Sequence, residues 1–426
     1  MTKLYNLVDA RLDHRCHLSL NKILERPDSP LPHIFPEYAD LEGFYRLIKN
    51  PRLSKNDFMN NIAQSTVDRI SETEVAVIHD TSFFNPKLNL KNKKLGSKGL
   101  MGHLSLAAST GEHPQVYGAL NLEVLKRDGS KKSDKESARW MKGVEASEGL
   151  KGASLKMIHI MDREGDIYQH LLMWQERRFS YVIRACKNRK TSEYEGIFDV
   201  VEKEPSRVEL TCRLSKREEH FSTKHKKIHP KREAREAKLH ASAKRLEIKK
   251  PSYLGEISRS VEVNVVRVWE EGGPEESQVE WFLLTSENID SAEDIKKVIH
   301  LYRRRWLIEE FFKGLKTGCK IEEKQFEGQQ SWEKLLAFYM PVTAKIMNLR
   351  LIDKVSLSSL KLSLSETQIE ILEAYKKLKI KDSKDLILAL ASLGGHIKYN
   401  GPPGWQVLHR AYKELQLLEM GWRLKM

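Results

Sequence analysis

The 426-residue chain lacks the hallmarks of secreted, zinc-stapled and membrane-spanning proteins. Its only four cysteines, Cys16, Cys186, Cys212 and Cys319, lie far apart and form no CxxC or Cys/His pair. This excludes a disulfide scaffold and a zinc ribbon, and it favours a reducing cytoplasm. No uncharged apolar run approaches the roughly 18 residues needed to span a bilayer. The N-terminus also has no apolar segment typical of a signal peptide.

The sequence does have an excess of positive charge. Lys and Arg number 73 against 59 Asp and Glu, which gives a formal net charge of +14. With 40% apolar and 31% charged residues, the composition is that of a folded chain long enough for two or three domains. These values predict a polyanionic partner, either nucleic acid or a membrane surface.

Much of the excess charge lies between Arg213 and Lys250, where 14 Lys and Arg occur with five Glu. A polybasic run neutralises phosphates and releases counterions. This one shows no apolar periodicity and no aromatic residue between Phe221 and Tyr253, so it lacks stacking platforms of its own. We interpret it as a segment that follows a nucleic-acid backbone without reading sequence; the alternative is a solvated loop with no specific partner. Membrane binding fits less well, because no amphipathic helix with a Trp/Leu face accompanies the run.

The order of apolar patterns predicts an α/β fold. The first 64 residues show helical spacing, and short strand-like runs follow at 75–78, 103–107, 115–125, 155–161 and 179–183. A helix is predicted over 167–177, between the last two strands, and a strand–helix–strand unit is typical of a mixed α/β sheet. Two more strands are predicted at 261–268 and 279–284, with helices from Ala292 onward.

Two aspartates directly follow predicted strands. Asp80 follows residues 75–79, and Asp162 follows residues 158–161. A carboxylate at the tip of a strand is held rigidly near the sheet edge, where ligands gather in α/β folds. Two such carboxylates repel each other unless a divalent cation lies between them, and oxygen ligands favour Mg²⁺ or Mn²⁺. For either residue alone, the alternative is a turn former or a helix cap.

A one-sided polar stripe is predicted on a helix over 301–316. At about 100° per residue, four side chains project within an arc of about 60°: Tyr302, Arg305, Glu309 and Lys316. Lys313 and Trp306 border this stripe, while the apolar residues face the opposite side and would pack on the core. A salt-bridged surface helix explains the spacing equally well. The tyrosine and the indole favour nucleic acid.

The spacing Tyr302-x2-Arg305-x3-Glu309-x6-Lys316 resembles the Y-R-E-K signature of bacterial DDE transposases, in particular the transposon-five branch of the insertion-sequence-four family. Further segments resemble family motifs in the same order: Phe44 to Pro51, His79-Asp80-Thr81-Ser82, Lys135-Glu136-Ser137 with Trp140, and Asp162-Arg163-Glu164-Gly165-Asp166. The resemblance extends from about Asp9 to Leu424, nearly the whole chain.

This resemblance implies a ribonuclease-H-like, mixed-sheet catalytic core in which Asp80, Asp162 and Glu309 are the catalytic, metal-binding triad. Two Mg²⁺ ions are expected there, with Mn²⁺ as a substitute. The implied activity is cut-and-paste DNA transposition, by strand nicking, hairpin formation and resolution, and strand transfer. The implied partners are transposon-end inverted repeats and target DNA, bound by a homodimer in a synaptic complex. A bacterial cytoplasmic, nucleoid-associated location is expected.

The resemblance also implies DNA contacts. Tyr302, Arg305 and Lys316 match positions that grip phosphates beside the scissile bond. Trp281 matches a tryptophan on which a flipped base stacks, although a core strand residue is its alternative reading. Arg184 matches a DNA-contacting arginine, with a solvated strand end as its alternative. The expected DNA-binding set also includes Lys313, Trp306, Arg163, Arg11, Arg15, Arg46 and Lys49.

Three domains are predicted: an N-terminal helical DNA-recognition domain (1–64), a catalytic domain (65–354) and a C-terminal helical dimerisation domain (355–426). The catalytic domain carries a β-rich basic insertion at about 187–280, and dimer contacts are expected from about Ser356. The family usually has more helix before the part that resembles Asp9–Asp13. An alternative is therefore an N-terminally shortened inhibitor that binds DNA or dimerises without full activity.

Two further points concern the motifs. A stand-alone ribonuclease-H-type nuclease is a second alternative, although Trp281 and the Y-R-E-K spacing speak against it. His79 stands where the family more often has Gln or Glu. We expect its side chain to point away from the Asp80 face of the strand.

Overall fold

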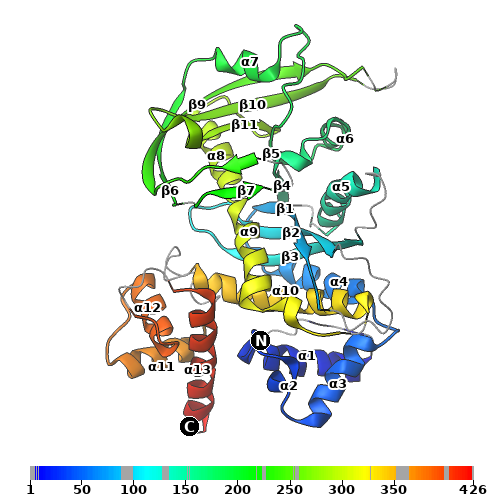
Figure 1. The fold of residues 1–426 in the computed structure, drawn as a ribbon, viewed down its shortest axis with the longest axis vertical. Helices are drawn as coiled ribbons and strands as arrows, with labels where there is room; N and C mark the ends of the chain where they lie inside the picture. The colour runs from blue at the N-terminus through cyan, green and yellow to red at the C-terminus, as the bar shows by residue number, and fades with distance from the viewer. Residues whose placement is uncertain are drawn as a thin grey trace. The chain divides into compact units, whose positions relative to one another are not determined.

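The structure is a computed structural model that describes residues 5, 7, 9–87, 99–126, 134–150, 152, 154–216, 218–222, 227–252, 254, 259–326, 328–351, 364–397 and 403–424. The chain divides into two compact units (Figure 1). Unit 1 consists of Met1–Lys156 together with Trp306–Met426, and unit 2 of Met157–Arg305. The proposed three-domain division stays a prediction.

Unit 1 begins with four helices, which confirm the helical character predicted for the N-terminal region. They are α1 (Ala10–Glu25), α2 (Leu31–Ile34), α3 (Tyr38–Lys49) and α4 (Lys55–Asp68). The Asp9 carboxylate caps α1 by accepting hydrogen bonds from the main chain of Arg11 and Leu12. Ser54 and Asp57 form a capping box at the start of α4.

The sheet of unit 1 has three antiparallel strands, β1 (Glu74–Phe84), β2 (Leu100–Ser109) and β3 (Val116–Lys126), with β2 in the middle. Helix α5 (Asp134–Glu148) packs on one face, where Trp140 contacts His103 of β2. On the other face, Phe84 of β1 contacts Phe312 of α9 (Trp306–Lys313) and Trp332 of α10 (Gln329–Arg350). The face opposite α5 is therefore the one that α9 covers.

The C-terminal part of unit 1 is helical, with α11 (Glu366–Lys376), α12 (Ser383–Leu393) and α13 (Trp405–Arg423). Ser365 and Gln368 form a capping box that begins α11. The three helices share an apolar core that includes Leu372, Leu390 and Leu408. Ser356, from which dimer contacts were expected, lies outside the described residues.

Unit 2 contains a six-stranded mixed sheet in the order β4-β5-β11-β10-β9-β6. Its strands are β4 (Lys156–Met161), β5 (Ser180–Arg184), β6 (Val208–Leu214), β9 (Arg235–Ile248), β10 (Val261–Glu270) and β11 (Glu280–Thr285). β4 and β5 are parallel, and the other neighbours are antiparallel. The helices are α6 (Tyr168–Arg177), α7 (Ile197–Glu202) and α8 (Ala292–Arg303), and β7 (His220–Ser222) pairs with β8 (Lys227–His229).

The basic run 213–250 is more ordered than the sequence predicted. Its second half forms β9, a 14-residue strand hydrogen-bonded on both sides, to β6 and β10. Ala237, Leu239, Ala241 and Ala243 are buried along it, whereas Lys244 and Arg245 are exposed. The interpretation of this stretch as a solvated loop is therefore wrong for β9.

The α/β class predicted from the sequence is confirmed. Three antiparallel strands precede the parallel strand–helix–strand unit β4–α6–β5, an order typical of a ribonuclease-H-like core, with helices before and after it. Within the described part of the chain, no helix has both the length and the apolar character needed to cross a membrane.

Candidate active site

Asp80 lies within β1 and not at its tip, so that part of the prediction is wrong. The strand continues to Phe84 because its second half pairs with β2, and Asp80 lies opposite Leu104 in this register. The side chain is half-buried, and its Oδ1 accepts a hydrogen bond of 2.7 Å from the main-chain N–H of Thr81. His79 is fully buried and its Nδ1 lies 3.0 Å from Ser105 Oγ on the face beneath α5, which agrees with the expectation that it points away from Asp80.

Glu309 belongs to the helix that packs on this strand. It is exposed on α9, and α9 contacts β1 (Figure 1). The contact is apolar, with the rings of Phe84 and Phe312 6.1 Å apart in an edge-to-face arrangement. Unit 1 thus places two predicted catalytic carboxylates, Asp80 and Glu309, on two elements that pack together.

The signature segment is not one continuous helix, contrary to the sequence prediction. Helix α8 ends at Arg303, Arg304 and Arg305 form a turn, and α9 begins at Trp306. Lys316 lies in a π-helical turn, Gly314–Gly318, that directly follows α9. Such π-helical turns are frequent at functional sites.

Lys316 is anchored against β1. Its Nζ lies 5.0 Å from the centre of the Phe84 ring, a cation–π contact. Burial lowers the pKa of Lys316, while the nearby Glu322 carboxylate raises it. Glu322 Oε1 also accepts a hydrogen bond of 2.6 Å from the main-chain N–H of Asn85, just past the end of β1. The lysine therefore lies at the end of the strand that carries Asp80.

Asp162 is at a strand end, as predicted. It directly follows β4 and is half-buried. It is the N-cap of a short 3-10 helix, Arg163–Gly165, and its Oδ1 accepts a hydrogen bond of 2.9 Å from the main-chain N–H of Glu164. Asp162 belongs to unit 2, whereas Asp80 and Glu309 belong to unit 1.

Asp166, the last residue of the D-R-E-x-D motif, has a structural role that the sequence did not reveal. It is buried, its carboxylate forms an ion pair with Arg189, and it accepts a hydrogen bond of 2.8 Å from the main-chain N–H of Cys186. These bonds tie the turn after β4 to the segment after β5. In the sequence, only the motif spacing marks Asp166. The ion pair itself leaves no local pattern, because Arg189 lies 23 residues further along the chain.

The chemistry of the proposed metal ligands fits a hard divalent cation, because all three are carboxylates. One oxygen of Asp80 and one of Asp162 each accept a main-chain N–H, which holds these side chains in place. Among the described residues, no three or more His, Cys, Asp or Glu side chains form a group able to hold a metal ion. The structure therefore supports the donor type of the proposed site.

Unit 2 brings together several of the predicted DNA contacts. The rings of Trp281 in β11 and Tyr302 in α8 meet edge to face, with centroids 5.3 Å apart. Tyr302 is 5% exposed, so it is largely buried and not on an open polar stripe. Trp281 is half-buried, which leaves part of the indole accessible. The tryptophan is therefore neither a sealed core residue nor a fully exposed one.

Arg184, at the end of β5, lies beside this aromatic pair. Burial is the main cause that lowers its pKa; Tyr302 raises it, and the positive charges of Arg163 and Arg305 lower it further. The guanidinium stays charged at neutral pH, since arginine titrates far above it. Its Nη2 donates a hydrogen bond of 3.1 Å to the main-chain oxygen of Glu280. Arg163, Arg184 and Arg305 thus form a group of cations near Tyr302, which suits a phosphate.

The N-terminal candidates are partly neutralised. Arg15 forms an ion pair of 3.1 Å with Asp40, and Arg46 one of 2.9 Å with Glu42. Lys49 lies 5.9 Å from the centre of the Tyr45 ring, and Arg11 is exposed on α1.

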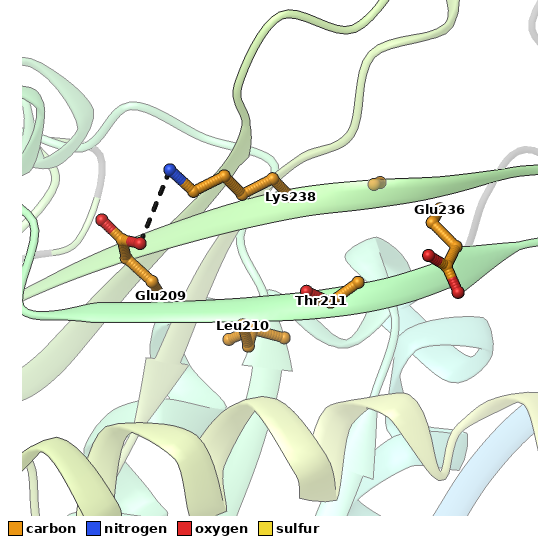
Figure 2. A pocket seen from close by; sticks show the side chains of 6 residues that line it. Glu209, Leu210, Thr211, Glu236 and Lys238 are labelled. Atoms are coloured by element: carbon orange, nitrogen blue, oxygen red, sulfur yellow. Dashed lines mark ion pairs between the residues drawn. The ribbon is translucent and has the colours of Figure 1, made fainter.

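A shallow hollow of about 490 Å³ lies on unit 2 between β6 and β9 (Figure 2). It is lined by Glu209, Leu210, Thr211, Glu236, Ala237 and Lys238. Lys238 already forms ion pairs with Glu209 (3.5 Å) and Glu271 (2.9 Å). None of the residues predicted to be catalytic lines it, and we assign it no role in the chemistry.

Comparison with known proteins finds a family model that matches part of the chain and a solved structure that is similar to it. Residues 157–340 match the family model described as a transposase DDE domain. The matched segment includes Asp162, Trp281, Glu309 and Lys316. Among solved structures, the chain is similar to a cryo-EM structure of the piggyBac transposase synaptic complex with hairpin DNA, with 11% sequence identity and a TM-score of 0.40. That alignment covers 98% of this chain and 73% of the other.

Proposed function

We propose that this chain is a DNA transposase of the insertion-sequence-four type, transposon-five branch, which moves DNA by cut-and-paste transposition. The observation that carries the proposal is the match of residues 157–340 to a transposase DDE domain. The matched segment contains the complete Tyr302, Arg305, Glu309 and Lys316 spacing as well as Asp162. The proposed steps are nicking, hairpin formation and resolution, and strand transfer.

Asp80, Asp162 and Glu309 are the proposed ligands of two divalent cations, Mg²⁺ or Mn²⁺. When bound, such ions activate the attacking oxygen and stabilise the leaving oxygen of phosphoryl transfer. The chain's contribution is to hold the carboxylates rigidly, since phosphoryl transfer depends on positioning and charge stabilisation. The main-chain hydrogen bonds to Asp80 and Asp162 support that role.

The remaining signature residues are proposed to bind DNA. Tyr302, Arg305 and Lys316 would bind the phosphates beside the scissile bond, and Arg184 is a further proposed DNA contact. A flipped base would stack on Trp281, which offers a half-buried indole braced by Tyr302. Base–aromatic stacking contributes about 1–3 kcal/mol, which can largely offset the cost of unstacking a base.

A homodimer is proposed for the synaptic complex, and α13 supports it. Its last turns carry several exposed apolar side chains: Leu417, Leu418, Met420, Trp422 and Leu424. Leu417 is 51% exposed and Met420 61%. Clustered exposed apolar residues at one helix end are typical of an interaction surface.

The direct test is cleavage of a DNA duplex that carries the ends of the element encoding the chain, in the presence of Mg²⁺. The unmodified protein is expected to give nicked, hairpin and strand-transfer products. Glu309→Ala is expected to give none of them while it still binds the duplex. Glu310→Gln is the matched control on the same helix, because Glu310 pairs with Arg350 (3.3 Å) and is not a proposed ligand. It is expected to cleave as the parent does.

Cleavage by Glu309→Ala at the parent rate would contradict the proposed catalytic assignment. The alternative function, a transposition inhibitor, predicts binding without cleavage. The unmodified chain would then bind the duplex or form dimers but release no cleaved product at any Mg²⁺ concentration.

A further inference from the structure

Several polar side chains are buried in unit 1 beneath α5, on the face of the sheet opposite Asp80. Because side chains alternate along a strand, His79 and Thr81 of β1 share this face, where they lie opposite Ser105 and His103 of β2. His79, His103 and Ser105 are fully buried. Burying polar groups is unfavourable unless they are hydrogen-bonded. The hydrogen bonds of these side chains therefore show which residues fix the middle of β1.

The hydroxyl of Thr81 connects two of these groups. Arg139 of α5 donates from Nε to Thr81 Oγ1 over 3.0 Å, and His103 Nδ1 lies 2.9 Å from the same oxygen. A guanidinium can only donate, so the Thr81 oxygen accepts from Arg139. The contact with His103 is a second hydrogen bond of the same hydroxyl, and its direction depends on which ring nitrogen carries the proton. One hydroxyl is thus fixed from both sides.

The His103 ring takes part in this network as a neutral group. Burial, and then the positive charge of Arg139, lower the pKa of His103 to about 3, so the ring is neutral at physiological pH. Its Nε2 has no hydrogen-bond partner in the part of the chain that the structure describes, so the hydrogen bond of this ring is the one between Nδ1 and Thr81.

Helix α5 fits closely over this network. Arg139 is 8% exposed, and the Trp140 ring meets the His103 ring edge to face with centroids 4.7 Å apart. At Gly143, a Cβ atom would lie 2.9 Å from Ser105 Oγ and 3.0 Å from His79 Nδ1. Glycine is thus what allows the helix to approach Ser105 and His79 this closely.

The network reaches the Asp80 carboxylate through one residue. The main-chain N–H of Thr81 donates to Asp80 Oδ1 over 2.7 Å. The hydroxyl of Thr81 is held on one face of β1, and the carboxylate of Asp80 is held by the same residue on the other. Fixing Thr81 therefore also fixes the direction of the Asp80 oxygens.

We infer that Thr81, held by Arg139 and His103, is a positioning residue that orients the Asp80 carboxylate toward a divalent cation. The inference rests on the proposed function, in which Asp80 is a metal ligand. This role explains why the buried Arg139 donates a hydrogen bond to Thr81, which lies 58 residues away in the sequence.

The test compares Thr81→Val with Thr81→Ser. Valine keeps the shape and removes the hydroxyl, whereas serine keeps the hydroxyl. Mn²⁺ binding to the protein–duplex complex, followed by electron paramagnetic resonance, is expected to weaken about tenfold in Thr81→Val and to change less than about twofold in Thr81→Ser. The KM for the duplex is expected to stay at the parent value while kcat falls with Mn²⁺ affinity. Equal Mn²⁺ affinity in Thr81→Val and the parent would overturn the inference.

Arg139→Met provides a second route, which also serves if Thr81→Val does not fold by circular dichroism. It removes the donor to Thr81 and is expected to weaken Mn²⁺ binding about tenfold as well. The double variant is expected to bind Mn²⁺ no more weakly than either single variant, because the residues act as one unit. Multiplied effects in the double variant, or parent-like binding by Arg139→Met, would overturn the network.

Asp80→Asn separates this inference from the proposed function. If Asp80→Asn is inactive while Thr81→Val binds Mn²⁺ as the parent does, the network is wrong and the function stands. If Asp80→Asn cleaves as the parent does, the metal-ligand assignment fails, and the positioning role fails with it.

Discussion

The two units of the chain supply different parts of the proposed site. Unit 1 carries Asp80 and Glu309 on a strand and a helix that pack together. Unit 2 carries Asp162 and a group of aromatic and cationic residues, among them Trp281, Tyr302 and Arg184. Two of the three proposed carboxylate ligands thus lie in unit 1, whereas the aromatic pair and the arginines around it lie in unit 2.

The two units also differ in the residues that hold the proposed site residues in place. In unit 1 the support is buried and polar, because Thr81, Arg139 and His103 lie behind Asp80. In unit 2 the support is aromatic, with Tyr302 packed against Trp281. Changes to the residues that support Asp80 should therefore affect chemistry first, and changes to the Trp281–Tyr302 pair should affect DNA handling first.

The largest effect is expected from removing a carboxylate in either unit. Asp80→Asn in unit 1 and Asp162→Asn in unit 2 should each slow strand cleavage on the order of 10³-fold, because a metal ion contributes several kcal/mol to the transition state. Single-turnover cleavage of the end duplex measures the loss, and a gel-shift assay checks that the duplex is still bound. If only one of the two variants lost cleavage, the carboxylate in the other unit would not be a metal ligand.

Trp281→Ala is expected to separate hairpin formation from nicking. The first nick should continue at a near-parent rate, while the hairpin rate falls by about 10- to 100-fold, since base stacking is lost. Quantifying the two products on a denaturing gel gives both rates. Trp269→Ala on the neighbouring strand β10 is the matched control, as its ring packs on His240. Unchanged hairpin yield in Trp281→Ala would refute the stacking role.

Acid should destabilise the protein through buried histidines in both units. Burial lowers the pKa of His409 in unit 1, and of His170 in unit 2, to about 4. Below pH 6.5 the unfolded chain then binds more protons than the folded one, so stability falls as the pH drops from about 6.5 toward 4. At pH 5 each histidine should cost about 2 kcal/mol. Urea unfolding at pH 7 and pH 5 tests this. Between the two pH values, the free energy of unfolding should fall less in His409→Gln than in the parent.

The smallest effect is expected from Lys316→Met. The lysine is proposed to neutralise one phosphate, so the slope of log affinity against log salt should decrease by about 1. Fluorescence anisotropy of the end duplex at several salt concentrations measures the slope. Lys345→Met is a control, because that lysine lies over the Tyr412 ring and is not a proposed phosphate contact. Equal slopes for Lys316→Met and the parent would show that Lys316 does not bind a phosphate.

Much of the fold could be predicted from the sequence, because several strands are rich in Val, Ile and Leu. β4, β5, β10 and β11 lie within a few residues of their predicted positions. β9 was missed, since its buried side chains are mostly small, such as Ala237, Ala241 and Ala243. Small residues give little periodic signal in a run rich in Lys and Arg.

The candidate site was predicted in its residue types and not in its local geometry. Spacing alone suggested one helix over 301–316, but the chain turns at Arg304 and Arg305. The π-helical turn that carries Lys316 depends on packing: a Cβ atom at Gly314 would lie 2.7 Å from Trp405 of α13. Arg139 and Thr81 also meet only through the fold, 58 residues apart. Contacts of this kind leave no local pattern in a single sequence.

The most direct test of the central claim is a change of metal preference at Asp162. In Asp162→Cys a soft thiolate replaces a hard carboxylate oxygen at nearly the same length, and thiolates disfavour Mg²⁺. Cleavage of the end duplex should therefore be lost in Mg²⁺ and largely restored in Mn²⁺, whereas Asp162→Ala should stay inactive in both. Equal cleavage by Asp162→Cys in Mg²⁺ and Mn²⁺ would contradict the claim that this carboxylate of unit 2 binds the catalytic metal.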